Sequence, residues 1–261
     1  MPQLSIDAIC MNTEPVPDWL IPDTLYRGSQ ILIAAMEGVG KSAFCYTLSN
    51  ALATGSEFIG RVGPCRVLYF DEENARGELA AYVRWSWRGL GSPSLDLLRA
   101  NLRIESLTLG VSLDWSMTMR TLAAEFKPDL IIVDTANPAC HIRNENDNGE
   151  ASAASHEIRL AQAVAGPGCC AIVLKHLRLN SELGRLDVRG AKAWKGAVDA
   201  IWFHLARPGR RRPDGWRNTY IRPEKYRAYG LRDVLSITPR VEPQSLFALE
   251  IRRDKSDGLE P

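Results

Sequence analysis

The segment AMEGVGKS, residues 35–42, carries the residue types that hold a nucleoside triphosphate. It follows the pattern G-x-x-x-x-G-K-[ST], with alanine in place of the first glycine. Backbone N–H groups of such a loop, at the start of a helix, point toward a phosphate, and glycine lets the backbone approach it closely. We therefore expect ATP to be bound by Gly38, Val39, Gly40, Lys41, Ser42 and Ala43.

Lys41 and Ser42 have different chemical tasks in this loop. The lysine reaches the β- and γ-phosphates, and the serine hydroxyl ligates Mg²⁺. Ala35 is a mild departure, because alanine can often adopt the conformation in which this position leaves a strand. A chance glycine turn is the alternative interpretation, but an apolar run precedes the loop and an apolar pattern of helical spacing follows it.

Three further apolar segments end in side chains that could act on a bound triphosphate. Residues 66–73, RVLYFDEE, end in carboxylates, residues 129–134, DLIIVD, end in Asp134, and residues 171–176, AIVLKH, end in His176. Hydrolysis needs a metal ligand, a group that activates water and a group that contacts the γ-phosphate. Asp134 suits the first task, a glutamate of the first segment the second, and His176 the third. The alternative is that these residues cap helices or make ordinary hydrogen bonds.

Apolar strands that alternate with amphipathic helices must position these residues. We expect strands at residues 30–36, 65–71, 101–106, 129–135 and 169–176, and helices at residues 41–54, 76–88, 114–126 and 149–164. This alternation predicts an α/β fold with a mostly parallel sheet covered by helices on both faces. Ligands bind such sheets at the carboxyl ends of the strands. The C-terminal segments 199–206, 217–227 and 245–251 predict antiparallel strands added to one edge.

Size and composition agree with one such domain. The chain has 261 residues and a net charge of +1, so no global basic field indicates a polyanionic partner. Residues 1–28 are interpreted as a lead-in and residues 29–261 as the domain. There is no Cys-x-x-Cys spacing, no signal peptide and no apolar run long enough to cross a bilayer. We expect a cytoplasmic protein without a membrane partner.

The ordered motifs resemble a known family. The segments AMEGVGKS, VLYFDEEN, LIIVDTANP, AIVLKH, RGAKAWKGAVDAIWF and EKYRAYG are similar to RecA-fold ATPases of the DnaB/RepA group, especially small RepA-like hexameric helicases of plasmids and phages. The resemblance extends from about Trp19 to the C-terminus. It implies a RecA-like P-loop NTPase fold and an ATP-driven, ring-forming helicase or translocase on single-stranded DNA, used in the replication of a plasmid, phage or mobile element.

The resemblance also implies roles for single residues. Glu73, rather than Glu72, falls on the catalytic glutamate of the family, Asp134 on its Walker B aspartate, and His176 on its γ-phosphate sensor. Tyr82 stands where the family often has an arginine that stacks on adenine, so we expect Tyr82 to stack on the base.

Lys225 and Arg227 fall on a Lys-x-Arg pair that, in hexameric members, contacts the neighbouring subunit's γ-phosphate. A planar, permanently charged arginine suits the charge that develops on phosphoryl oxygens. A finger that acts between subunits requires a homo-oligomer, for which we expect a hexameric ring. A solvated basic strand edge is the alternative interpretation.

The segment after His176 is the candidate for contact with single-stranded DNA. Basic side chains that follow a phosphate backbone would give salt-dependent binding without sequence preference. The candidates are Arg178, Arg185, Arg189 and Lys192. An ordinary exposed loop is the alternative. Two other functions remain open: a DNA-stimulated RecA paralogue that does not unwind DNA, as a recombination mediator or loader, and a KaiC-like nucleotide-switched interaction protein that does not bind DNA.

Overall fold

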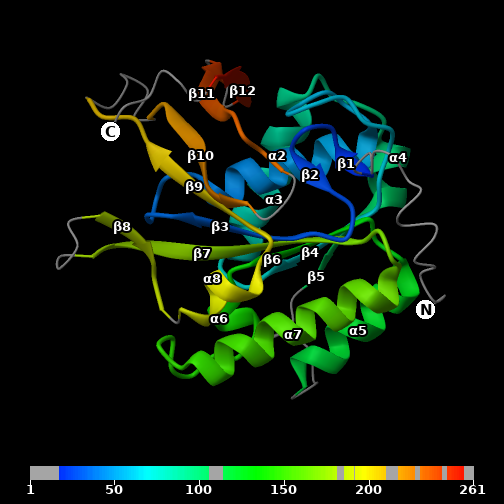
Figure 1. Ribbon diagram of the computed structural model, residues 1–261. Helices are drawn as coiled ribbons and strands as arrows, with labels where there is room; N and C mark the ends of the chain where they lie inside the picture. The colour runs from blue at the N-terminus through cyan, green and yellow to red at the C-terminus, as the bar shows by residue number, and fades with distance from the viewer. Residues whose placement is uncertain are drawn as a thin grey trace, which may run out of the picture.

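A computed structural model of the chain is organised around one large, mixed β-sheet (Figure 1). It describes residues 18–105, 114–180, 185–190, 192–209, 217–226, 230–242 and 246–255. Within these residues the main sheet has ten strands, in the order β12-β11-β10-β9-β3-β7-β6-β4-β5, and β8 pairs with β7. The α/β fold predicted from the sequence, a mostly parallel sheet with antiparallel C-terminal strands, is confirmed.

Six strands form the parallel part of the sheet. They are β9 (Ala200–Ala206), β3 (Gln30–Ala35), β7 (Cys170–Asn180), β6 (Leu130–Asp134), β4 (Val67–Asp71) and β5 (Leu102–Glu105). Antiparallel strands β10 (Thr219–Tyr226), β11 (Val234–Glu242) and β12 (Leu246–Asp254) extend the β9 edge. The short β8 (Arg185–Val188) turns back along the end of β7.

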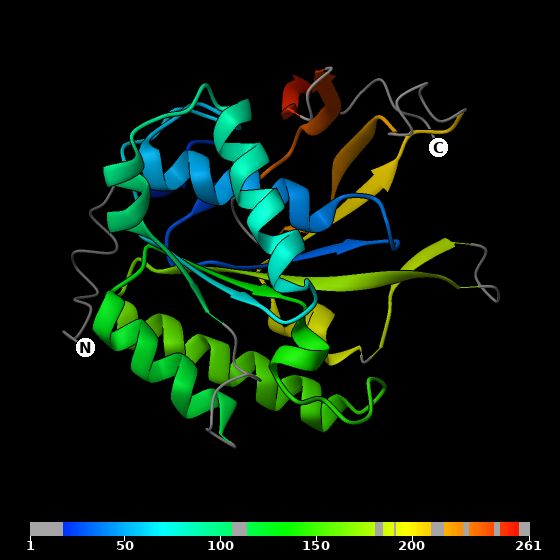
Figure 2. The same ribbon diagram turned by 180° about the vertical axis from the view of Figure 1, so that it is seen from behind.

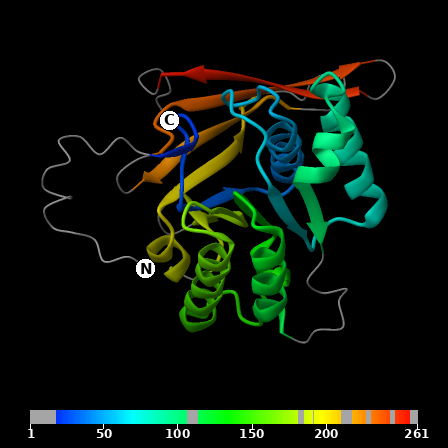
Figure 3. The same ribbon diagram turned by 90° about the vertical axis from the view of Figure 1, so that its right-hand side faces the viewer.

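Helices cover both faces of the parallel strands (Figures 2 and 3). One face carries α2 (Lys41–Thr54), α3 (Arg76–Gly89) and α4 (Leu95–Asn101), together with the small sheet of β1 (Trp19–Ile21) and β2 (Leu25–Tyr26). The opposite face carries α5 (Trp115–Phe126), α7 (Asn148–Ala165) and the short α6 (Ala136–Ala139) and α8 (Ala193–Ala197). None of the described helices is both long and apolar enough to cross a membrane.

The sequence of β3 shows why helices cover both faces. Leu32 and Ala34 belong to the core beneath α5 and α7, whereas Ile31 and Ile33 belong to the core beneath α2. Side chains alternate between the two faces of a strand, so a strand that is apolar at every position needs cover on both.

Several elements differ from the sequence prediction. The lead-in, from Trp19 onward, folds into β1 and β2, and its Leu20, Ile21 and Leu25 are buried in the core. The segment after His176, predicted as a loop, begins as an extension of β7 that pairs with β8. Strand β11 was not predicted. Pro239 interrupts its alternating pattern. Its pairing with β10 and β12 depends on residues outside the segment, so the segment's own pattern does not indicate it.

Candidate active site

The loop between β3 and α2 has the backbone that a phosphate-binding loop requires. Gly38 and Gly40 have φ angles of 71° and 102°, in the left-handed region that favours glycine. No atom lies within 4 Å of the place where a Cβ would stand at either residue, so the requirement is conformational rather than steric. Gly40 caps α2, and no side chain caps the first N–H groups of this helix. These groups can therefore receive an anion.

Alanine is readily accommodated at the first position of the motif. Ala35 is the last residue of β3, is fully buried and does not have a positive φ. It pairs with His176 on β7 and with His204 on β9. The departure from the glycine pattern thus lies in regular strand, before the residues whose backbone faces a phosphate.

Asp134 ends β6, and its carboxylate has one unsatisfied oxygen. The Tyr69 hydroxyl donates a hydrogen bond of 2.7 Å to Oδ2, while the buried Oδ1 has no hydrogen-bond partner among the described residues. Burial raises the pKa of Asp134 to about 7, although the hydroxyl groups of Tyr69 and Ser42 favour its charged form. A divalent cation beside Oδ1 would supply the missing partner and stabilise the negative charge. Ser42 and Asp134 therefore fit Mg²⁺.

Asp71 fixes the turn that carries Glu73. Its buried carboxylate accepts a hydrogen bond from the Tyr46 hydroxyl and from the backbone N–H groups of Glu73, at 3.0 Å, and Asn74, at 2.9 Å. Glu78 accepts from the Ala75 N–H at the start of α3, at 3.2 Å. The alternative interpretation, that acidic residues of this segment bind backbone N–H groups near the start of a helix, therefore holds for Asp71 and Glu78 but not for Glu73.

Glu73 and His176 face each other across the carboxyl end of the sheet. Glu73 Oε1 lies 3.7 Å from His176 Nε2, and both side chains remain about one third exposed. Burial, and then the charge of Lys41, lower the pKa of His176, whereas Glu73 opposes this shift. A neutral imidazole can donate one N–H to a phosphate oxygen or orient the carboxylate beside it. The buried Lys41 begins α2 at the same end of the sheet.

Tyr82 lies in a stack of aromatic rings. Its ring is parallel to that of Tyr46 at a centroid distance of 5.7 Å, and Tyr46 stacks in turn on Tyr69 at 4.4 Å. Trp85 meets Tyr82 edge-on at 6.1 Å. One face of the ring is therefore occupied within the chain.

The two residues of the predicted intersubunit pair differ in their place in the structure. Lys225, on β10, donates hydrogen bonds from Nζ to the carbonyl oxygens of Lys195 and of Val198, the latter at 3.0 Å, at the C-terminal end of α8. These contacts lie within one chain. Arg227 lies outside the described residues.

The basic residues proposed for DNA contact fall into three groups. Arg178 on β7 and Lys192 before α8 are exposed. Arg189 Nε lies 3.0 Å from Glu145 Oε1, so its charge is paired within the chain. The side chain of Arg185, on β8, lies outside the described part of the structure.

Three residues at the site have no role predicted from the sequence. Asp71 stands at the expected strand end, but its function in the turn depends on contacts with Tyr46 and the backbone. Lys175 is 2 % exposed, donates to Asn137 Oδ1 and lies 5.4 Å from the Trp194 ring; burial lowers its pKa to about 8. His204 gives no sequence signal, because a histidine inside an apolar strand carries no motif.

The sequence matches the family model for an AAA domain, AAA_25, over residues 2–182. The chain belongs to this AAA domain family. The match spans the phosphate loop, both strand-end carboxylates and His176. Membership makes the chain a P-loop ATPase of the AAA/RecA-like class, whose members bind nucleotide and usually Mg²⁺. No curated protein shows a significant match to the chain.

Proposed function

We propose that this AAA domain protein hydrolyses ATP with Glu73 as the general base and uses the reaction to move along single-stranded DNA as a ring. The observation that carries the catalytic part is the group of Lys41, Asp134, Glu73 and His176 at one end of the sheet, with Glu73 and His176 3.7 Å apart. The similarity of the ordered motifs to RepA-like helicases supports the DNA-dependent part.

Each residue has one task in the proposed reaction. Lys41 and the N–H groups of the loop hold the β- and γ-phosphates. A water oxygen attacks the γ-phosphorus, its proton passes to the Glu73 carboxylate, and the bond from phosphorus to the ADP oxygen breaks. His176 donates to a γ-phosphate oxygen. Mg²⁺, held by Ser42 and Asp134, would neutralise phosphate charge.

A pair of adjacent glutamates tests the choice of base. Glu73→Gln should bind ATP with nearly unchanged affinity and hydrolyse it roughly 100-fold or more slowly, because general-base catalysis is lost. Glu72→Gln is the matched control, and we expect it to retain nearly the wild-type rate. Steady-state hydrolysis and equilibrium ATP binding measure the two effects. A normal rate in Glu73→Gln would refute the assignment.

The DNA-dependent part is tested by hydrolysis with and without single-stranded DNA over a salt series. Stimulation should weaken steeply with salt, because binding to a phosphate backbone releases counterions. Arg178→Ala combined with Lys192→Ala should reduce the stimulation and leave the rate without DNA unchanged. Strand displacement then separates a helicase from an ATPase that does not unwind.

A second candidate is a nucleotide-switched interaction protein that does not bind DNA. It is favoured by the pairing of Arg189 with Glu145, which removes part of the positive charge from the proposed DNA surface, and by the pairing of the nearby Lys195 with Asp187. Hydrolysis that is indifferent to single-stranded DNA at low salt would support this candidate over a DNA translocase.

A further inference from the structure

Three tyrosine rings stack on one another next to the candidate active site. The ring of Tyr46, on α2, is parallel to that of Tyr69, on β4, at a centroid distance of 4.4 Å, and to that of Tyr82, on α3, at 5.7 Å. Tyr46 and Tyr69 are fully buried. Because stacked rings restrict each other's position, the stack fixes α2, which begins at the phosphate loop, relative to the strand before Glu73 and the helix after it.

The two buried tyrosines each donate a hydrogen bond to a carboxylate at the end of a strand. The Tyr46 hydroxyl donates to Asp71 Oδ2, and the Tyr69 hydroxyl donates to Asp134 Oδ2 at 2.7 Å. Burial, and then the charge of the carboxylate that each contacts, raise the pKa of both tyrosines. Both hydroxyl groups therefore keep their protons and can act as donors.

Asp71 connects Tyr46 to the turn that carries Glu73. Its Oδ1 accepts hydrogen bonds from the backbone N–H groups of Glu73 and Asn74, and its Oδ2 also accepts from Asn74 Nδ2 at 2.9 Å. Tyr82, on the helix that follows the turn, stacks on the same Tyr46 ring. Tyr46 therefore contacts the residue before the turn through its hydroxyl and the helix after the turn through its ring.

A second residue of α2 supports the same arrangement. Asn50 follows Tyr46 by about one helical turn, so the two side chains lie on one face of α2. Asn50 Nδ2 donates to the Val83 carbonyl oxygen at 2.9 Å and to Ser86 Oγ at 2.5 Å, both on α3. One face of the helix that begins with Lys41 thus holds α3, and with it the turn that carries the proposed base.

We propose that Tyr46 is a positioning residue for ATP hydrolysis: through Asp71, its hydroxyl holds the Glu73 carboxylate at the distance from the phosphate loop that attack by water requires. This inference rests on the proposed role of Glu73 as the general base. A small displacement of a catalytic group lowers the rate strongly, because the reacting atoms must lie close together and in line.

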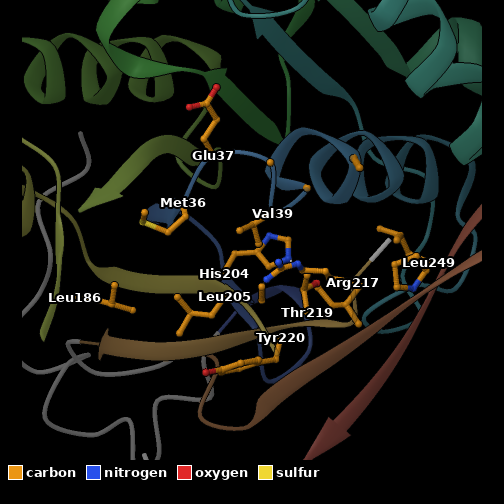
Figure 4. A pocket seen from close by; sticks show the side chains of 16 residues that line it. Met36, Glu37, Val39, Leu186, His204, Leu205, Arg217, Thr219, Tyr220 and Leu249 are labelled. Atoms are coloured by element: carbon orange, nitrogen blue, oxygen red, sulfur yellow. The ribbon is translucent and has the colours of Figure 1, made fainter. Parts of the chain in front are cut away.

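The space beside the phosphate loop does not involve the tyrosine stack. A cavity of about 740 Å³ opens there, and its lining comes mainly from the loop and from β9, β10, β11 and β12 (Figure 4). Strand β12 also contacts α3, so the C-terminal strands curve over the α2 face of the sheet (Figure 3). Among the described residues that line the cavity, none belongs to the stack. Removal of the Tyr46 hydroxyl should therefore change the rate of hydrolysis and not the affinity for ATP.

The test removes this hydroxyl alone. Tyr46→Phe keeps the ring for both stacking contacts but takes the buried donor from Asp71. We expect kcat at saturating ATP and Mg²⁺ to fall roughly tenfold or more, with the Kd for ATP unchanged. Ser49→Ala, on the same helix, is the matched control, because its buried hydroxyl donates to the Cys45 carbonyl oxygen at 2.7 Å, within α2. This control should keep the wild-type kcat.

A double-mutant cycle with Asp71→Asn tests the path from Tyr46 to Glu73. If Tyr46 acts through Asp71, Tyr46→Phe should add little to the loss of kcat that Asp71→Asn already causes. Losses that multiply would overturn the inference, as would a normal kcat in Tyr46→Phe or an equal loss of ATP affinity. If Tyr46→Phe does not fold, Asp71→Asn alone decides: a loss of kcat with unchanged Kd supports the inference, and a normal kcat overturns it.

Glu73→Gln separates this inference from the proposed function. If Glu73→Gln loses hydrolysis and Tyr46→Phe retains it, only the positioning role of Tyr46 fails. If Glu73→Gln hydrolyses ATP at the normal rate, or if the wild-type protein does not hydrolyse ATP at all, the proposed function fails and the inference fails with it.

Discussion

Two histidines flank Ala35, and their environments give them different roles. His176 is about one third exposed beside Glu73, whereas His204 is fully buried beside Thr219. Burial and the charge of Lys41 lower the pKa of both rings. Neither therefore adds a full positive charge at neutral pH, and Lys41 remains the cation assigned to the phosphates.

The buried histidine predicts a specific dependence of stability on pH. The pKa of His204 is about 3 in the folded state and about 6.5 in an unfolded chain, so below pH 6.5 the unfolded state binds more protons. The contribution of His204 to the free energy of unfolding is complete above pH 6.5 and falls as the pH falls toward 3. At pH 4.5 the loss is about 2–3 kcal/mol.

Urea unfolding of wild type and His204→Phe at pH 8 and pH 4.5 measures this contribution. The variant should lose stability at pH 8, because the Thr219 hydroxyl is left without its partner, but it should lose less than wild type on acidification. His156→Phe, at an exposed position on α7, is the control. Equal acid sensitivity of wild type and His204→Phe would contradict a buried neutral histidine.

At the scale of elements, the segment after Asp134 packs on the segment after His176. Arg189 pairs with Glu145, and the Ala193 N–H donates to Asn148 Oδ1 at 3.0 Å. Gly190, with a φ of 96°, lies so close that a Cβ there would stand 2.4 Å from the Glu145 carbonyl oxygen. The segments that follow Asp134, the proposed metal ligand, and His176, the proposed phosphate contact, are thus connected outside the candidate site.

Gly190→Ala should separate these two segments. The left-handed backbone and the collision with Glu145 should lower the free energy of unfolding by about 1–3 kcal/mol. Gly196→Ala, in α8, is the matched control: no atom lies within 4 Å of the place where its Cβ would stand, and its φ is not positive. That variant should be neutral or slightly stabilised. Denaturant unfolding of both proteins measures the difference, and equal stability would contradict the close approach.

Helices and strands that have a pattern in their own residues could be predicted from the sequence. Contacts between segments far apart in the chain could not. The phosphate loop, the strands that carry Asp134 and His176, and the helices α2, α3, α5 and α7 have local patterns of spacing. The turn function of Asp71 needs Tyr46, and the cavity needs β11 and β12 to curve over α2. The folding of the lead-in onto the core likewise depends on residues far along the chain.

At the scale of the whole molecule, Lys225 and Arg227 differ in what each would contribute to a ring. Lys225 binds the end of α8 in its own chain, at Lys195 and Val198. Arg227, by the resemblance to hexameric helicases, would act on the neighbouring subunit. Mixing of inactive variants can separate a contribution within a chain from one made between chains.

Arg227→Ala should still bind ATP but should no longer hydrolyse it. Lys41→Ala should also lose hydrolysis, in its case because it no longer binds the nucleotide. In randomly mixed rings of the two, about one quarter of interfaces combine an intact loop with an intact arginine, so hydrolysis should partly return. In rings that mix Lys225→Met with Lys41→Ala, hydrolysis should not return. The contacts that Lys225→Met loses, with Lys195 and Val198, lie within its own chain, so no neighbouring subunit can replace them. Recovery in the Lys225→Met mixture would place this lysine across the interface, and failure of the Arg227→Ala mixture would remove the arginine from it.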